Sequence, residues 1–162
     1  MASFKKLSNL PGFKSKTLYF STKTTAMKLI PYVYFQGNCE EALNTYAKIF
    51  NGEIEGLTRY ADNFPAPDDH KNKILHASLL FGENVIMFSD SMPGGTVNYG
   101  NGHCLCLGLN DETHARNVFN QLSEGGKIKM EMEKQFWGSL YGEVFDKFGI
   151  HWMINCELPA DK

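Results

Sequence analysis

A repeated pattern of apolar residues constrains the fold of this chain more than any other feature of its sequence. Three apolar positions of one predicted helix return in a second predicted helix at a constant offset of 73 residues: Ala42, Tyr46 and Ile49, then Ala115, Phe119 and Leu122. Apolar residues at this spacing form one face of a helix. A constant offset over three positions predicts an internal repeat.

Strand-like runs surround the first helix. A β-rich run at 29–35 precedes it, and we expect the helix to begin at Asn38, with Glu41 as the capping-box partner, and to end at Asn51-Gly52. Short runs rich in β-branched and aromatic residues predict three further strands. These strands are expected at 53–60, 74–81 and 84–90, the last two joined by a turn at Gly82-Glu83.

The second half repeats this order after a linker rich in Gly and Asn at 92–102. A strand at 103–109 precedes a helix that Asp111 should cap and that Gly125-Gly126 should end. Three strands follow, at 127–134, 140–145 and 151–156. The sequence therefore predicts an α+β fold of two βαβββ modules, at about 28–91 and 102–157, with two curved sheets.

Residues 1–26 differ in composition from the rest of the chain. They contain five Lys, eight Ser or Thr and no acidic residue, whereas the remainder has 11 basic and 18 acidic residues. We expect a basic, Ser/Thr-rich N-terminal extension that precedes the folded domain. An organelle transit peptide is the alternative, because such leaders are also hydroxyl-rich and free of acids.

Composition also limits the partners and the compartment. No apolar run approaches the roughly 18 residues of a membrane span, and an acidic body without a basic aromatic strip argues against nucleic acid. None of the four cysteines, Cys39, Cys104, Cys106 and Cys156, forms a Cys-x-x-Cys pair. Reduced thiols and a cytoplasmic location are therefore expected.

Four stretches carry a resemblance to a known family. They are P-Y-V-Y-F-Q-G-N-C-E-E-A-L (31–43), H-A-S-L-L-F-G-E-N-V-I-M-F-S-D (76–90), F-W-G-S-L-Y-G (136–142) and D-K-F-G-I-H-W-M-I (146–154). Together with the module order they resemble the PhnB-like branch, or 3-demethylubiquinone-9 3-methyltransferase domain, of the vicinal oxygen chelate superfamily. That superfamily includes glyoxalase I, bleomycin resistance proteins, fosfomycin-modifying enzymes and ring-cleaving dioxygenases. The resemblance implies that residues 27–162 form a single glyoxalase-like domain with cup-shaped mixed sheets, and that the protein is a homodimer.

The resemblance also allows a test for a metal site. Superfamily enzymes hold a divalent metal on the inner face of the cup with His, Gln or Glu ligands. The corresponding positions here are Pro31 or Tyr32, Cys104 and Met153. A thioether is soft and neutral and does not replace an anionic oxygen ligand. We therefore expect no metal cofactor; the donors left for an improvised site are His76, Cys104 and His151.

Strand alternation predicts which side chains face the cup. Leu105 and Leu107 should face the helix, which directs Cys104 and Cys106 inward. On the last strand the same alternation directs His151 and Met153 inward. The candidate ligand-binding residues are Tyr32, Tyr34, Cys104, Cys106, Trp137, His151 and Met153. No catalytic residue is assigned, and Glu143 fits a solvated strand face as well as a site.

Three functions are compatible with these residues. The first is binding of a flat or apolar small molecule in the cup without the usual metal. The second is a metal-dependent lyase or dioxygenase of the glyoxalase type. The third is methylation of a quinone precursor, which only the family label suggests, since the chain lacks the Gly-rich strand-to-helix turn of methyl-donor sites.

Overall fold

The computed structural model describes residues 27–158 of the chain. The predicted extension at residues 1–26 lies outside this range, so it stays a prediction. One compact unit begins at Pro31 and contains all the helices and strands that are described below.

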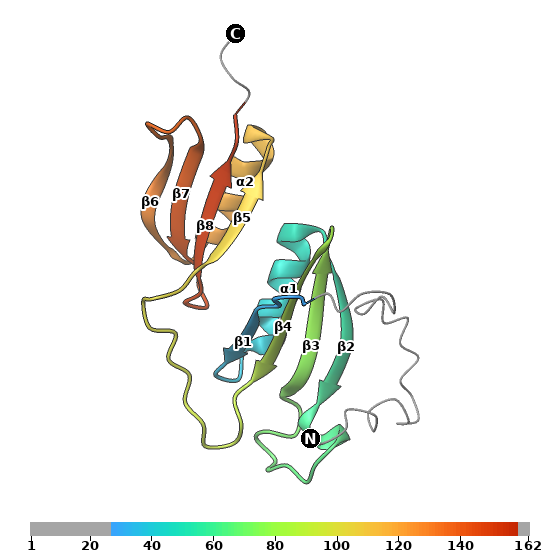
Figure 1. The fold of residues 1–162 in the computed structure, drawn as a ribbon. Helices are drawn as coiled ribbons and strands as arrows, with labels where there is room; N and C mark the ends of the chain where they lie inside the picture. Colours follow the sequence, from blue (N-terminus) through green and yellow to red (C-terminus); the bar gives the residue numbers. More distant parts are fainter. Residues whose placement is uncertain (1–26, 159–162) are drawn as a thin grey trace. The chain divides into compact units, whose positions relative to one another are not determined.

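The first module has the predicted order of elements (Figure 1). Its sheet has the order β1-β4-β3-β2, with β1 parallel to β4 and the other pairs antiparallel. The first strand is shorter than predicted, because it begins at Tyr32 and residues 29–31 lie before it. The elements are β1 (Tyr32–Phe35), α1 (Cys39–Phe50), β2 (Glu53–Arg59), the short 3-10 helix η2 (Tyr60–Asp62), β3 (Ile74–Phe81) and β4 (Asn84–Asp90).

The second module repeats the arrangement. Its sheet has the order β5-β8-β7-β6, with β5 parallel to β8. The elements are β5 (Leu105–Leu109), α2 (Glu112–Ser123), β6 (Lys127–Lys134), β7 (Leu140–Phe145) and β8 (His151–Cys156). The predicted α+β fold of two βαβββ modules with mixed sheets is thus confirmed.

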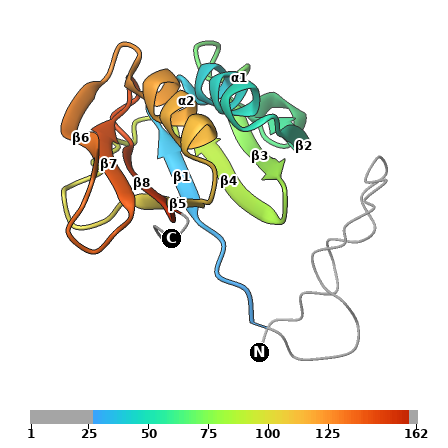
Figure 2. The same ribbon diagram turned by 90° about the horizontal axis from the view of Figure 1, so that it is seen from above.

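Each helix packs against one face of its own sheet, and α1 and α2 lie side by side (Figure 2). Alternation along the strands supplies the apolar side chains for this packing. On β8, for example, Trp152, Ile154 and Cys156 are fully buried, whereas His151 and Met153, which alternate with them, are only half-buried. Burying one large apolar side chain stabilises the fold by about 1.5–3 kcal/mol. The face of each sheet that points away from the helix therefore carries side chains that do not take part in this packing.

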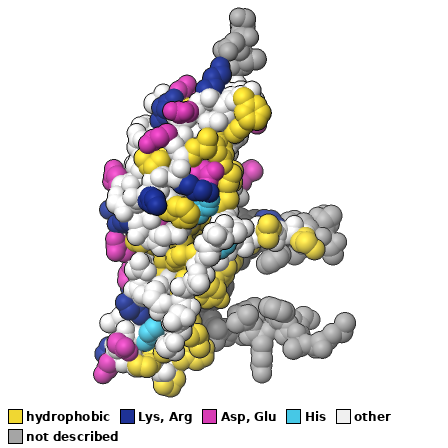
Figure 3. Space-filling view, turned by 90° about the vertical axis from the view of Figure 1, so that its left-hand side faces the viewer, with side chains coloured by type: hydrophobic (Ala, Val, Ile, Leu, Met, Phe, Trp, Pro, Cys, Tyr) yellow, Lys and Arg dark blue, Asp and Glu magenta, His cyan; other side chains and the backbone are white. Residues whose placement is uncertain are grey.

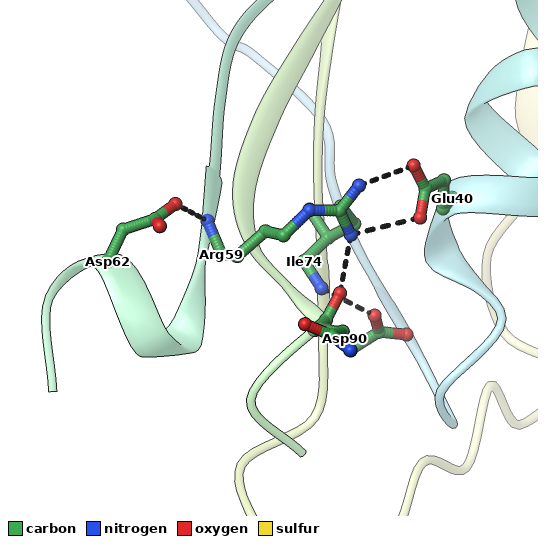
Figure 4. Close-up of polar contacts among 6 residues, drawn as sticks. Glu40, Arg59, Asp62, Ile74 and Asp90 are labelled. Carbon is green, nitrogen blue, oxygen red and sulfur yellow. Dashed lines mark hydrogen bonds and ion pairs between the residues drawn. The ribbon is translucent and has the colours of Figure 1, made fainter. Parts of the chain in front are cut away.

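The first helix begins after Asn38, as predicted, but the predicted capping box does not form. Asn38 makes no capping hydrogen bond with its side chain. Instead Asp90, at the end of β4, accepts a hydrogen bond from the backbone N–H of Cys39 at 3.0 Å. It also accepts one from the backbone N–H of Ile74 at 2.8 Å (Figure 4). The buried Asp90 carboxylate satisfies an N–H that the helix itself leaves unpaired. In the second module the predicted cap is confirmed, because Asp111 accepts from the His114 N–H at 2.6 Å.

An exposed ion pair adds a second tie between α1 and the end of β2. The Arg59 guanidinium contacts both carboxylate oxygens of Glu40, at 2.6 and 3.0 Å (Figure 4). The pKa of Glu40 is lowered, first by this hydrogen bond. Because both side chains are largely accessible to water, the pair adds little stability.

A buried acid also joins the two modules. Asp146, between β7 and β8, accepts hydrogen bonds from the Tyr46 hydroxyl of α1 at 2.5 Å and from the Trp152 indole at 2.7 Å. It also accepts from the backbone N–H groups of Phe148 and Ile150, at 2.9 and 3.0 Å. Burial, and then the neighbouring Asp146, raise the pKa of Tyr46, so its hydroxyl stays a donor. Of these four donors only Tyr46 belongs to α1, so its bond to the buried acid joins α1 to the second module.

Candidate functional site

Each sheet has one face that its helix does not cover. We call these the first open face, on β1, β3 and β4, and the second open face, on β5, β7 and β8. On the first open face alternation places Tyr32, Tyr34, His76, Ser78, Leu80, Val85, Met87 and Ser89. On the second it places Cys106, Gly108, Tyr141, Glu143, Phe145, His151, Met153 and Asn155.

A hydrogen-bonded network occupies the centre of the second open face. One oxygen of the Glu143 carboxylate accepts a hydrogen bond from the Tyr141 hydroxyl at 2.9 Å. Its other oxygen lies 2.7 Å from Nζ of Lys129, on β6, and 2.8 Å from Nε2 of His151. The side chains of Glu143 and His151 are 16% and 11% exposed, so most of this network is shielded from water. A shielded carboxylate with three partners is a rigid polar group in a largely apolar face.

The electrostatics of this network fix two protonation states. The pKa of Glu143 is lowered, first by the Lys129 hydrogen bond and, less strongly, by those from Tyr141 and His151. The pKa of Tyr141 is raised, first by burial and then by its hydrogen bond to Glu143. At neutral pH Glu143 is therefore an anion and Tyr141 a neutral donor.

Sulfur atoms lie beside this network. The Cys104 thiol contacts the Met153 thioether, with the two sulfurs 2.8 Å apart. Cys106 pairs with Met153 in the register of β5 and β8. Burial, followed by the neighbouring Cys104, raises the pKa of Cys106, which keeps this thiol protonated. The predicted inward direction of Cys104, Cys106 and Met153 agrees with these contacts, and their proposed role in ligand binding stays a prediction.

The first open face gathers the remaining aromatic candidates. The rings of Tyr32 and Tyr34 are 5.0 Å apart, and the Tyr32 hydroxyl lies 3.2 Å from Nδ1 of His76. Burial lowers the pKa of His76, so this imidazole is neutral near pH 7. Among residues 27–158, no carboxylate forms a hydrogen bond with His76. This face therefore offers aromatic surface and one neutral imidazole.

Trp137 lies in the turn between β6 and β7, at the margin of the second open face. Its ring is 5.6 Å from that of Tyr141, and its neighbour Phe136 is 97% exposed. Ile128 and Met130 of β6 are exposed too. In Figure 3, hydrophobic side chains gather over the centre and right of the view, while charged side chains gather along its left margin. The aromatic turn therefore extends an exposed apolar surface.

The structure separates the three donors that were predicted for an improvised metal site. His76 lies on the first sheet, whereas Cys104 and His151 belong to the second module. Within residues 27–158, no three His, Cys, Asp or Glu side chains are grouped so that they could hold a metal ion. The superfamily ligand positions hold Pro31 or Tyr32, the thiol of Cys104 and the thioether of Met153, which do not suit a hard divalent ion. The residues present therefore do not fit the metal of the superfamily.

Glu143 is the residue that the sequence reasoning left unassigned. Its strand alternates between buried Leu140, Gly142 and Val144 and half-buried Tyr141, Glu143 and Phe145. This alternation was visible in the sequence and could have placed Glu143 on the open face beside Tyr141. Its contact with His151 depends on the register of β7 with β8, which the alternation alone does not define.

A cavity on the other side of the sheets is an unsuitable ligand site. It has a volume of about 80 Å³ and lies between α1, α2 and the β7–β8 turn, lined in part by Ile49, Leu122 and Phe148. Pockets for small organic ligands usually measure about 300–1,000 Å³. This cavity holds at most a few water molecules.

No helix among the described residues is both long and apolar enough to cross a membrane.

Comparisons with known proteins place this arrangement in a family. A family model described as 3-demethylubiquinone-9 3-methyltransferase matches residues 27–155. Protein YjdN of Escherichia coli (strain K12) is 34% identical over 143 residues, which cover 80% of this chain and 95% of that protein.

Two solved structures show the same fold. A PhnB protein from Bacillus cereus, described as a 3-demethylubiquinone-9 3-methyltransferase, superposes with a TM-score of 0.70 at 25% identity, over 80% of this chain and 99% of that one. The fosfomycin resistance protein FosX from Listeria monocytogenes superposes with a TM-score of 0.59 at 8% identity, over 82% and 94%. At that identity the likeness to FosX concerns the fold alone.

Proposed function

The chain belongs to the 3-demethylubiquinone-9 3-methyltransferase family, the PhnB-like branch of the glyoxalase superfamily, and we propose that it binds a small, largely apolar molecule on the second open face. The observation that carries this proposal is the Glu143 network. An anion held by Lys129, Tyr141 and His151 lies on a face otherwise built of aromatic and sulfur side chains. Binding sites for small molecules combine such an apolar lining with a few fixed polar groups.

The shape of the ligand follows from the neighbours of Glu143. Phe145 and Met153 pair with His151 and Glu143 across β7 and β8, so they flank the polar centre. Aromatic rings and a thioether contact flat apolar surfaces well. The ligand that fits this face has a flat apolar body, which contacts Phe145 and Met153, and one polar group that reaches the Glu143 network.

We further propose that a second copy of the chain completes the site. A single sheet face cannot bury the 70–90% of ligand surface that is usual for such sites. Tyr32, Tyr34 and Trp137 are 41%, 53% and 50% exposed, and exposed aromatic surface of this kind is typical of a subunit contact. A homodimer in which the second open faces of two chains enclose the ligand, while Tyr32 and Tyr34 of the first open faces contribute to the subunit contact outside the ligand site, accounts for this exposure. The four free cysteines support the expected cytoplasmic location.

Two alternatives have less support. A metal-dependent lyase or dioxygenase needs ligands that the thiol of Cys104 and the thioether of Met153 do not supply. A methyltransferase usually places its methyl donor on a doubly wound parallel sheet. Both sheets here are mixed, with the orders β1-β4-β3-β2 and β5-β8-β7-β6.

The test of the binding proposal is a thermal-shift screen of the full chain with flat aromatic fragments that carry one polar group. We expect some fragments to raise the Tm, because a ligand that binds only the folded state stabilises it by mass action. The variant Glu143→Gln should weaken their binding about tenfold, the loss of one charge-assisted contact of about 1.4 kcal/mol. The matched control is His76→Asn, on the first open face. Equal binding by wild type and Glu143→Gln would contradict the proposed site.

Metal content and oligomeric state are measured on the same samples. We expect elemental analysis to find no stoichiometric metal, and added Ni, Zn, Mn or Fe to leave the Tm unchanged. One metal ion per chain that is lost on substitution of Cys104 or His151 would favour the lyase or dioxygenase alternative. Sedimentation should give a dimer that Trp137→Ala weakens; a monomer with full ligand binding would contradict the shared site.

A further inference from the structure

We infer that His151 accepts a proton from the bound ligand, with Glu143 as the residue that orients its ring. This inference rests on the proposed function, because it concerns a ligand on the second open face. It adds a chemical step to that binding. The ligand class is a flat molecule with an acidic O–H group, such as a phenol, or with an enolisable C–H group beside a carbonyl.

The first step of the argument is the hydrogen bond between His151 and Glu143. Nε2 of His151 lies 2.8 Å from the carboxylate of Glu143, and the carboxylate is held as an anion by Lys129 at 2.7 Å. An ionised carboxylate only accepts hydrogen bonds, so Nε2 must carry the hydrogen. In the neutral ring the lone pair then lies on Nδ1. The network therefore selects the tautomer in which Nδ1 is a base.

The second step concerns the surroundings of Nδ1. Among residues 27–158, no side chain or backbone group forms a hydrogen bond with this atom. The imidazole stacks on Phe145, with ring centroids 4.5 Å apart and an interplanar angle of 22°. This stacking and the bond to Glu143 together hold the ring in one orientation. An oriented imidazole whose second nitrogen has no partner is the arrangement of a general base.

The proton transfer itself is simple. The lone pair of Nδ1 takes the proton from the ligand, which leaves a phenolate or enolate and an imidazolium. The Glu143 anion stabilises the imidazolium without taking its proton, as carboxylates do in catalytic His–carboxylate pairs. Lys129 and Tyr141 support this, because both donate to Glu143 and favour its ionised form. No oxidant, reductant or further reactant is required.

His76 is the natural control, because it lies on the open face of the other module without a carboxylate. Its Nδ1 lies 3.2 Å from the hydroxyl of Tyr32, a neutral group. A phenol orients an imidazole but does not stabilise the imidazolium as an anion does. His76 should therefore show no comparable proton transfer.

The first measurement is the tautomer of each histidine, by ¹⁵N NMR of the labelled full chain at neutral pH. We expect His151 to be protonated on Nε2 with a free lone pair on Nδ1, and Glu143→Gln to mix the two tautomers. A hydrogen on Nδ1 in wild type would overturn the inference.

The second measurement uses 4-nitrophenol, whose phenolate absorbs visible light. Binding is followed by quenching of tryptophan fluorescence, and ionisation by phenolate absorbance at a fixed pH at which most free probe is protonated. We expect bound probe to be ionised, and His151→Asn and Glu143→Gln to lower its ratio of phenolate to phenol about tenfold, equivalent to one pKa unit. His76→Asn should leave the ratio unchanged.

The outcomes separate the inference from the proposed function. Binding with no phenolate, or with phenolate that does not depend on His151, would overturn the inference and leave the binding site intact. Absence of binding would count against the proposed function and, with it, the inference. Rescue of the His151→Asn variant by added imidazole would support a base at this position.

Discussion

The two modules share strand order and helix position but use their polar residues differently. In the first module Asp90 serves its own module, bonding to the start of α1 and to β3, and His76 faces the neutral Tyr32 hydroxyl. In the second, Asp146 reaches across to α1 and His151 faces an anion. The two modules therefore share a backbone arrangement, whereas the polar residues that differ between them make different hydrogen bonds.

The largest expected effect separates the two buried acids. Asp146→Ala should lower the free energy of unfolding by about 3–5 kcal/mol, because it leaves four buried donors without an acceptor. Asp90→Ala removes two backbone contacts and should lower it by about 2–3 kcal/mol. Urea unfolding at neutral pH measures both. An equal or larger loss for Asp90→Ala would contradict the structural difference between the modules.

The next largest effect on stability is expected where α2 packs closely on its sheet. A Cβ at Gly142 of β7 would lie 2.8 Å from the Phe119 ring and 3.1 Å from Cα of Met132. Gly142→Ala should therefore lower the free energy of unfolding by about 1–3 kcal/mol. Gly108→Ala on β5 is the control: a Cβ there meets no atom within 4 Å, so its effect should stay within about 0.5 kcal/mol. Similar losses for the two variants, measured by urea unfolding, would argue against close packing at Gly142.

The two helices differ by one hydroxyl group at a repeated position, where α1 has Tyr46 and α2 has Phe119. Tyr46→Phe makes the first helix like the second and should lower the free energy of unfolding by about 1–2 kcal/mol, because Asp146 loses one donor. A double-mutant cycle with Asp146→Asn should show that the two losses are not additive. Tyr99→Phe, which removes a more exposed hydroxyl bond to Tyr34, is the control. Additive losses would show that the hydroxyl bond contributes no coupling.

The smallest expected effect is a pH dependence from the first open face. Burial places the pKa of His76 below its ordinary value of 6.5 in the folded protein, so the unfolded chain binds more protons in that range. Its contribution to stability is present above pH 6.5 and is lost as the pH falls towards the folded pKa. His76→Asn should flatten the stability curve in this window, as measured by Tm between pH 5 and 8. An unchanged curve would contradict a buried neutral imidazole.

Local patterns predicted most of the fold. The alternation of β8 correctly separated Trp152 and Ile154, which pack on α2, from His151 and Met153, which lie on the open face. Asp111 was correctly predicted as a cap, because its partner His114 is only three residues away. These features depend on neighbours in the chain, and periodicity describes them well.

Contacts between distant residues were not predicted. Asn38 is the N-cap residue of α1, as predicted, but the side-chain hydrogen bond to the start of the helix comes from Asp90, 51 residues away from Cys39, and not from the predicted capping box. The bond between Tyr46 and Asp146 spans 100 residues. No local pattern shows which strand end meets which helix, because that depends on how sheets and helices pack.

The sequence by itself determined the repeat, the order of the elements and the faces of the strands, because these follow from spacing along the chain. Only the tertiary structure decided the partners of the polar groups. Strand register brought His151 to Glu143, and packing of the two modules brought Asp146 to Tyr46. A hydrogen bond needs two atoms within about 3 Å of each other, and only the folded chain defines such distances.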